Sequence, residues 1–146
     1  MGDIAYRNIL VPIDERQMSK RVVDHALHVA EKEGGNLIVV YVEEKEGFES
    51  IFPKELSEKM IAVVNENIEA NMEYAISEAK KLGIAAEKII LKSEDIGGDL
   101  IRIAEERSVD LTVMGSESLR RDPLGSLTRW VIAADVGPVL VITSED

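Results

Sequence analysis

The sequence contains no cysteine among its 146 residues. This absence excludes disulfide bonds, thiol redox chemistry and cysteine-ligated zinc or iron–sulfur sites. No stretch reaches the roughly 18 consecutive apolar residues that a membrane-spanning helix needs. Residues 1–6 also lack the apolar core of a signal peptide. We therefore expect a cytoplasmic protein that makes no use of a membrane.

Positive charge is also scarce. The 17 Lys and Arg residues are outnumbered by 28 Asp and Glu residues, which gives a formal net charge of −11. No basic run gathers the cations, so the chain repels phosphate backbones and nucleic acid is not an expected partner. Hydrophobic residues make up 45% and charged residues 31%, as in ordinary folded domains. The length predicts a single domain over residues 1–146.

Five short apolar runs divide the chain, and each is rich in Val, Ile or Leu without clean alternation. Such runs are typical of strands buried on both faces of a parallel sheet. They are Ile9–Val11, Leu37–Val42, Ile89–Leu91, Leu111–Met114 and Val139–Ile142.

Helical periodicity fills most of the intervals between these runs. The first predicted helix contains Met18 to Ala30 and ends at Gly34, and the others cover Lys54–Leu82, Asp99–Glu106 and Ser126–Asp135. On the longest helix a single apolar stripe is predicted from Leu56, Met60, Val64, Ile68, Met72, Ala75, Ala79 and Leu82. The polar segment 43–53 is the one long connection, and we predict that it is mobile.

Strands that alternate strictly with helices predict an α/β fold: a doubly wound, five-stranded parallel sheet with helices on both faces. In such a sheet, ligands bind beyond the carboxyl ends of the strands, where the strand order reverses.

Two strand ends carry residues suited to a ligand. Pro12-Ile13-Asp14 ends the first strand, and Asp14 can accept hydrogen bonds from ribose hydroxyls. Met114-Gly115-Ser116 ends the fourth, and a loop leads from there to Gly125-Ser126 at a helix start. Gly115 allows close approach of backbone to a ligand, and helical N–H groups after Gly125 can hold an anion. The alternative is that these are turn glycines, a helix cap and a loop carboxylate.

Other sites find little support in the sequence. His25 and His28 are three apart on the first helix, but no third metal ligand is placed beside them, so we expect no metal site. The only tryptophan, Trp130, is expected to fill the core or to cover the last predicted helix. No P-loop or dinucleotide-binding glycine motif occurs. Receiver-domain chemistry needs an Asp after the third strand and a Lys after the fifth, and neither is present.

Taken together, the motifs resemble the universal stress protein family over nearly the whole chain. The matching segments are Asn8–Asp14, Asp110–Ser116, Leu124–Ser126, Val131-Ile132 and Gly137–Ile142. The resemblance implies an adenine nucleotide alpha hydrolase-like (Rossmann-like) sheet of order 3-2-1-4-5, with the reversal between the first and fourth strands. It also implies a homodimer paired through the last strand, at Pro138, Val139, Leu140, Val141 and Ile142. An apolar edge strand independently favours such pairing.

The ATP-binding motif of the family is altered in this chain. Family members that bind ATP carry Gly, two residues, a second Gly, nine residues, and then Gly before Ser or Thr. Here Gly115 is kept, Ser118 replaces the second Gly, and only six residues precede Gly125-Ser126. The loop is thus three residues shorter, which is about 10 Å of extended chain.

By resemblance, one cleft would hold ATP with Mg. Pro12, Ile13, Asp14 and Val42 would line the adenine and ribose pocket. Met114, Gly115, Ser116, Ser118, Gly125, Ser126, Leu127 and Thr128 would lie near ribose and phosphates, and Arg120 and Arg121 would add positive charge from the altered loop.

Two hypotheses of different class follow. In the first, the chain is a dimeric regulatory module that binds ATP or another adenine nucleotide. In the second, it binds none and is a dimeric stress-response scaffold or interaction protein with protein partners yet to be identified. No catalytic residues are expected; slow ATP hydrolysis or self-phosphorylation is the most that the hydroxyls of Ser116, Ser118, Ser126 and Thr128 would support.

Overall fold

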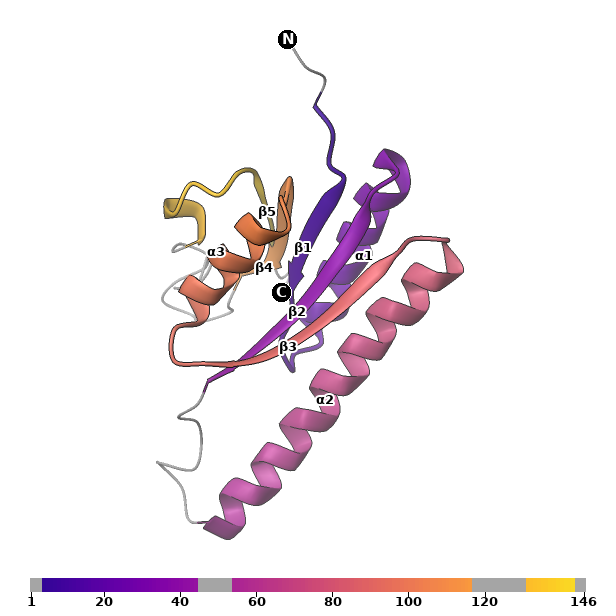
Figure 1. Cartoon of the computed structure of the whole chain (residues 1–146). Coiled ribbons are helices and arrows are strands. Elements are labelled where there is room, and N and C mark those ends of the chain that lie inside the picture. Colours follow the sequence, from indigo (N-terminus) through magenta and orange to yellow (C-terminus); the bar gives the residue numbers. More distant parts are fainter. Residues whose placement is uncertain (1–3, 45–53, 117–130, 144–146) are drawn as a thin grey trace.

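The computed structural model describes residues 4–44, 54–116 and 131–143. Within them lies a five-stranded parallel sheet of order β3-β2-β1-β4-β5, as predicted (Figure 1). The strands are β1 (Asn8–Pro12), β2 (Asn36–Glu44), β3 (Ala86–Ser93), β4 (Leu111–Gly115) and β5 (Val139–Ile142). The strand order therefore reverses beside β1, which pairs with β2 on one side and β4 on the other.

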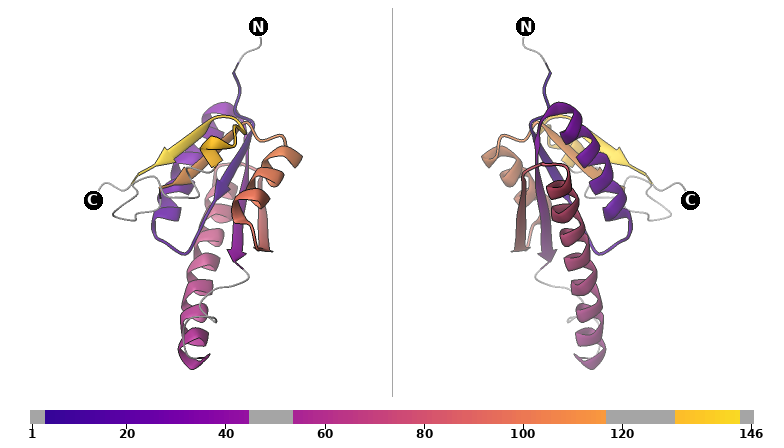
Figure 2. Two further views of the ribbon diagram at one scale, coloured as in Figure 1. Left: turned by 90° about the vertical axis from the view of Figure 1, so that its left-hand side faces the viewer. Right: turned by 90° about the vertical axis from the view of Figure 1, so that its right-hand side faces the viewer.

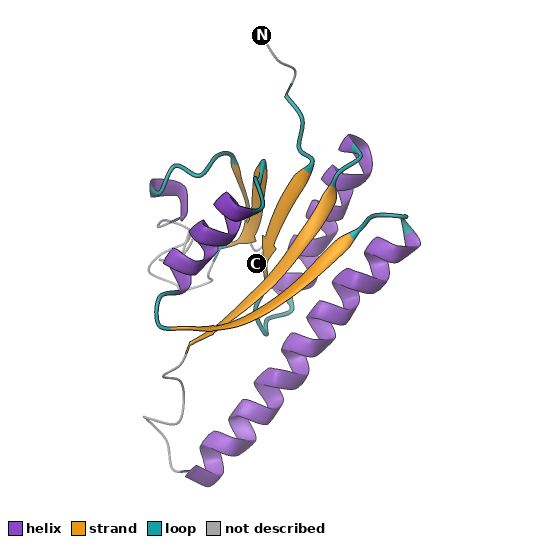
Figure 3. Ribbon diagram, in the orientation of Figure 1, coloured by secondary structure: helices purple, strands orange, loops and turns teal. Residues whose placement is uncertain are grey.

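Helices cover both faces of this sheet (Figures 2 and 3). Helices α1 (Met18–Glu33) and α2 (Lys54–Lys81) lie on one face, and α3 (Ile96–Glu106) lies on the other. Of the predicted fourth helix, residues 131–133 are helical and its start falls outside the described residues, together with Trp130. The right-handed crossovers between parallel strands account for this two-sided arrangement.

The central strands are buried on both faces because their side chains alternate between two apolar layers. On β1, Ile9 and Val11 face α1 and α2, whereas Leu10 packs toward α3. On β2, Val39 and Val40 divide in the same way, and both are fully buried. This two-sided burial explains why these runs are continuously apolar.

The edge strands differ from the prediction. On β3, Glu87, Lys88 and Lys92 are exposed and Ile90 is 50% exposed, while on β5 Leu140 is 37% exposed. The prediction that all five runs are buried on both faces is wrong for these two strands. Each has a neighbouring strand on one side only, so the covering helices do not enclose it fully.

Two boundaries also differ from the prediction. Helix α3 begins at Ile96 rather than Asp99, because the Asp95 side chain accepts a hydrogen bond from the Gly98 N–H at 3.0 Å and caps the helix. The first turn contains two glycines, Gly97 and Gly98, and because glycine disfavours helix the sequence did not predict this start. Strand β2 continues to Glu44, so the predicted connection over residues 43–53 begins later, and residues 45–53 fall outside the described part.

Only the C-terminal half of α2 packs on the sheet. Its buried apolar residues are Ile68, Met72, Ala75 and Ala79, whereas Leu56 is 47% exposed and Leu82 is 46% exposed. Figure 2 shows the N-terminal half of α2 extending beyond the sheet. The predicted stripe is therefore right in its centre and wrong at both ends. A helix that is longer than the strands beneath it has end residues that the sheet does not bury.

A bidentate ion pair joins the end of α3 to β3. Arg107 Nε and Nη2 donate to the two Glu87 carboxylate oxygens at 2.9 and 2.8 Å. These hydrogen bonds hold the pKa of Glu87 below its ordinary value and raise that of Arg107. Such fork-to-fork geometry is the strongest form of an arginine–carboxylate contact.

Replacement of Glu87 by Gln should reduce stability in a pH-dependent way. A depressed carboxyl pKa stabilises the fold above the ordinary pKa of 4.5, and this contribution is lost as the pH falls through the lower folded-state value. We expect Glu87→Gln to lower the free energy of unfolding by about 0.5–1 kcal/mol at pH 7. Urea unfolding at pH 7 and pH 3 measures this. The difference should be smaller at pH 3 than at pH 7, and Glu105→Gln on α3 is the control; a pH-independent difference would contradict the pairing.

Candidate functional site

A cleft lies at the carboxyl ends of β1 and β4, beside the start of α1. It encloses about 510 Å³, part of which is open to solvent. Parallel pairing of Ile9 with Leu111 and Leu10 with Thr112 brings these two strand ends together. The residues that line it are Pro12, Ile13, Asp14, Arg16, Met18, Ser19, Val22, Met114, Gly115 and Ser116.

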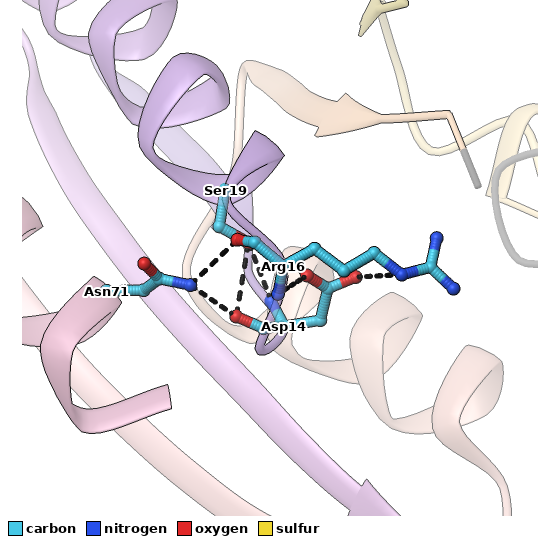
Figure 4. A network of polar contacts seen from close by, with 4 residues as sticks. All are labelled: Asp14, Arg16, Ser19 and Asn71. Atoms are coloured by element: carbon cyan, nitrogen blue, oxygen red, sulfur yellow. Dashed lines mark hydrogen bonds and ion pairs between the residues drawn. The ribbon is translucent and has the colours of Figure 1, made fainter. Parts of the chain in front are cut away.

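Asp14 organises the loop that forms one wall of the cleft (Figure 4). Its Oδ1 accepts hydrogen bonds from the Arg16 N–H at 2.8 Å and from the Ser19 hydroxyl, whose Oγ lies 3.0 Å away. Its Oδ2 lies 3.8 Å from Arg16 Nε, and both side chains remain more than 40% exposed. One oxygen of the carboxylate thus holds the loop while the other lies near a cation at the cleft.

The Ser19 hydroxyl supports the same loop from the first turn of α1. Its Oγ accepts a hydrogen bond from the Asp14 N–H at 3.0 Å and lies 3.2 Å from the Asp14 carbonyl oxygen. Ser19 is only 4% exposed. Gln17, at the N-cap position of α1, provides no side-chain cap, so Asp14 and Ser19 together satisfy the polar groups of this turn.

A side chain from α2 reaches the loop from the other side (Figure 4). Asn71 Nδ2 donates to the Asp14 carbonyl at 2.8 Å and to the Arg16 carbonyl at 2.9 Å. Asn71 is 4% exposed and lies beside the apolar residues with which α2 packs on the sheet. Its two amide hydrogens are thereby both used by backbone oxygens of the loop.

A second polar contact joins α2 to α1. The Tyr74 hydroxyl donates to Asp24, and Lys20 Nζ lies 5.7 Å from the centre of the Tyr74 ring. The hydrogen bond to Asp24, with burial and the charges of Asp24 and Glu78, raises the pKa of Tyr74 to about 12. Tyr74 therefore stays protonated at all physiological pH values and continues to donate to Asp24.

The end of β4 forms the opposite wall. The Ser116 N–H donates to the Ile142 carbonyl of β5 at 2.9 Å, and Ser116 is 6% exposed. A Cβ added to Gly115 would lie 3.1 Å from Val22 Cγ2 and 3.3 Å from Met18 Sδ. Gly115 thus has a packing role that its sequence motif did not reveal: it lets β4 approach α1 closely.

The structure brings six of the predicted nucleotide-site residues together in this cleft. They are Pro12, Ile13, Asp14, Met114, Gly115 and Ser116. Val42 lies on β2, where it pairs with Leu91 of β3; its side chain falls outside the described part of the structure. The others fall outside the described residues: Ser118, Arg120, Arg121, Gly125, Ser126, Leu127 and Thr128.

Sequence reasoning missed four lining residues and Asn71. Met18 and Val22 fall within the first predicted helix, and on α1 they also face the cleft. Arg16 and Ser19 lie within five residues of Asp14 in the sequence, so their place beside Asp14 could have been predicted. Asn71 gave no signal except that it is a polar residue next to an apolar helical stripe.

The described residues give no support to a metal site or a membrane-spanning helix. His25 and His28 are both exposed on α1. Among residues 4–44, 54–116 and 131–143, no group of three or more His, Asp or Glu residues could hold a metal ion. None of the helices in those same ranges is both long and apolar enough to cross a membrane.

Comparison with known proteins identifies the family. The universal stress protein family profile matches residues 5–143. The chain belongs to the universal stress protein family. A curated universal stress protein of Methanocaldococcus jannaschii is 27% identical over 148 residues, which cover 97% of this chain and 84% of that relative. The structure of a family protein from Burkholderia pseudomallei covers 99% of this chain and 100% of its own, with 26% identity and a TM-score of 0.72.

Two further family structures with the same fold are described as nucleotide complexes. One is a universal stress protein in complex with cAMP, with 23% identity, a TM-score of 0.68 and coverage of 96% of this chain and 99% of its own. The other is the Archaeoglobus fulgidus protein in complex with dAMP, with 22% identity, a TM-score of 0.65 and coverage of 97% and 100%.

The packing role of Gly115 predicts a specific coupling with Val22. Gly115→Ala should lower the free energy of unfolding by about 1 kcal/mol, because its Cβ crowds Val22 and Met18. In a Val22→Ala background the same substitution should cost little, since the nearest atom is gone. Urea unfolding of the four proteins gives the interaction energy. Equal costs in both backgrounds would show that Gly115 is not limited by this contact.

Proposed function

We propose that this protein binds an adenine nucleotide in the cleft between the ends of β1 and β4. The observation that carries the proposal is the cleft itself, at the point where the strand order reverses, lined by six residues of the two predicted strand ends. In doubly wound sheets this is the place where nucleotides bind. The cAMP and dAMP complexes of family members support the same ligand class.

The lining residues provide the contacts that a nucleoside needs. Ile13 and Met114 are apolar and buried, which suits the faces of a purine base. Asp14 retains a half-exposed carboxylate that can accept hydrogen bonds from ribose hydroxyls. Arg16 is the one cation among the described residues that line the cleft, and a guanidinium suits a phosphate group.

The shortened motif between Gly115 and Gly125 bears on the number of phosphates, not on the nucleoside. Family members that bind ATP have a longer spacing between these two glycines. We therefore propose that the loop sets how many phosphates the bound adenine nucleotide carries. Comparison of adenosine, AMP, ADP and ATP, the last two with and without Mg, separates recognition of the nucleoside from that of the phosphates.

Substitution of Asp14 tests the proposed site. Asp14→Asn should weaken nucleotide binding about fivefold, because a charged acceptor forms stronger hydrogen bonds to ribose hydroxyls than an amide does. Isothermal titration calorimetry with AMP and ATP measures the dissociation constant. Thermal unfolding supports it, since ligand at 100 times its dissociation constant adds about 2.7 kcal/mol of stability.

The matched control for this test is Glu15→Gln. It removes the same charge from the same loop, at a residue that does not line the cleft. Equal effects of the two substitutions would reflect net charge alone and would contradict a role for Asp14 in binding. If no adenine compound at millimolar concentration binds the wild-type protein, the proposal fails and the scaffold hypothesis takes its place.

We also propose that the protein forms a homodimer through β5. This strand is at the edge of the sheet, and the Pro138 and Ile142 carbonyls accept hydrogen bonds from the Thr112 and Ser116 N–H groups of β4. Because backbone groups alternate along a strand, those of Val139 and Val141 are directed to the open side. Pro138 donates nothing, which is tolerated at the first position of an edge strand.

A charged side chain on β5 tests the dimer. Leu140→Lys should shift the protein from dimer toward monomer, because lysine on an edge strand disfavours pairing between sheets. Sedimentation velocity measures the mass. Ile90→Lys, on the opposite edge strand β3, replaces another exposed apolar residue and should leave the dimer intact. Dissociation by both variants, or by neither, would contradict pairing through β5.

A further inference from the structure

We infer that Asn71 of α2 is a positioning residue for the nucleotide cleft: it fixes the backbone of the Asp14–Arg16 loop and thereby couples α2 to the site. The inference rests on the proposed function for its effect on ligand affinity, whereas the geometry of the loop can be tested without any ligand. Asn71 does not line the cleft and acts only through the loop.

Burial makes these contacts of Asn71 costly to lose. Its side chain is 4% exposed in the layer formed by α1, α2 and the sheet, next to the fully packed Met72. A buried amide is stable there only if its hydrogen-bonding groups are satisfied. Both recorded partners of its Nδ2 are main-chain oxygens of the loop, at 2.8 and 2.9 Å.

These two partners are separated by one residue, Glu15, so the single amide fixes the turn between them. The Asp14 carbonyl and the Asp14 carboxylate belong to the same residue, and rotation of its backbone would redirect the side chain at the cleft. The Ile13 N–H donates to the Val40 carbonyl at 2.9 Å and anchors the loop at the sheet end, whereas Ser19 anchors it at the helix end. Asn71 is the described contact that anchors its middle.

The coupling extends along α2. Tyr74, one turn further on, donates to Asp24 and so joins α2 to α1, the helix that follows the loop. The opposite half of α2 projects beyond the sheet, with Leu56 and Val63 47% and 57% exposed (Figure 2). A force or partner that shifts α2 would thus move the Asn71 amide relative to the loop, and by thermodynamic reciprocity ligand binding in the cleft would change the stability of α2.

The test compares Asn71→Leu with Asn67→Leu. The Leu side chain is branched like that of Asn and has the same number of non-hydrogen atoms, although it is bulkier, and it donates nothing to the Asp14 and Arg16 carbonyls. Asn67 is an exposed residue on the same helix. We expect Asn71→Leu to raise the dissociation constant of AMP about fivefold, because the loop spends less time in the binding conformation. Asn67→Leu should change it less than twofold.

A purely structural role is distinguished by a third variant. Ile68→Val removes one carbon from a buried side chain one turn away and should lower stability, while it leaves the hydrogen bonds from Asn71 to the loop in place. If affinity follows stability, Ile68→Val and Asn71→Leu would weaken binding in proportion to their loss of melting temperature, and the inference would be overturned. If only Asn71→Leu weakens binding, the positioning role is supported.

Amide hydrogen exchange without nucleotide separates this inference from the proposed function. The Arg16 N–H donates to Asp14 Oδ1, so its exchange rate reports the loop conformation. We expect Asn71→Leu to speed exchange at Arg16 at least tenfold while amides in β1 and β2 keep wild-type rates. Unchanged exchange at Arg16 would overturn the inference even if nucleotide binds. Absence of nucleotide binding with faster exchange would overturn only the proposed function and leave the positioning role supported.

Discussion

The pairing of β1 with β2 on one side and β4 on the other is the constraint from which the site follows. The chain leaves β1 toward α1 on one face of the sheet and reaches β4 from α3 on the other. In a doubly wound sheet the crevice lies beyond the carboxyl ends of the strands, at the point where the strand order reverses. The cleft at Asp14 and Gly115 is therefore a consequence of strand order, and its lining residues come from elements far apart in sequence.

Polar contacts then give this opening a defined shape. The Asp14 carboxylate and the Ser19 hydroxyl are hydrogen-bonded to each other and to N–H groups of the loop, and Asn71 donates to two carbonyls of the same five-residue loop. Gly115 permits β4 to approach α1 closely. A site held by rigid elements on both sides is preorganised for a ligand, and less binding energy is spent on ordering it.

Local sequence patterns predicted the elements well where burial is symmetric. β1, β2 and β4 are central, and their apolar runs matched two-sided burial. The same reasoning failed at β3 and β5 and at the ends of α2, because periodicity shows which residues are apolar but not which neighbours cover them. The order 3-2-1-4-5 followed from the family resemblance, since alternation of strands and helices alone allows several orders.

The sequence by itself determined the class of fold, the positions of the strands and the two strand ends that carry the cleft. It did so because the spacing of apolar residues, the glycines and the carboxylate of Asp14 at a strand end are local properties of the chain. Only the tertiary structure decided that Asn71 holds the loop at Asp14, 57 residues away, and that Gly115 packs on Val22. Such contacts depend on how helices lie across the sheet, and no spacing along the chain encodes a distance between elements that meet only after folding.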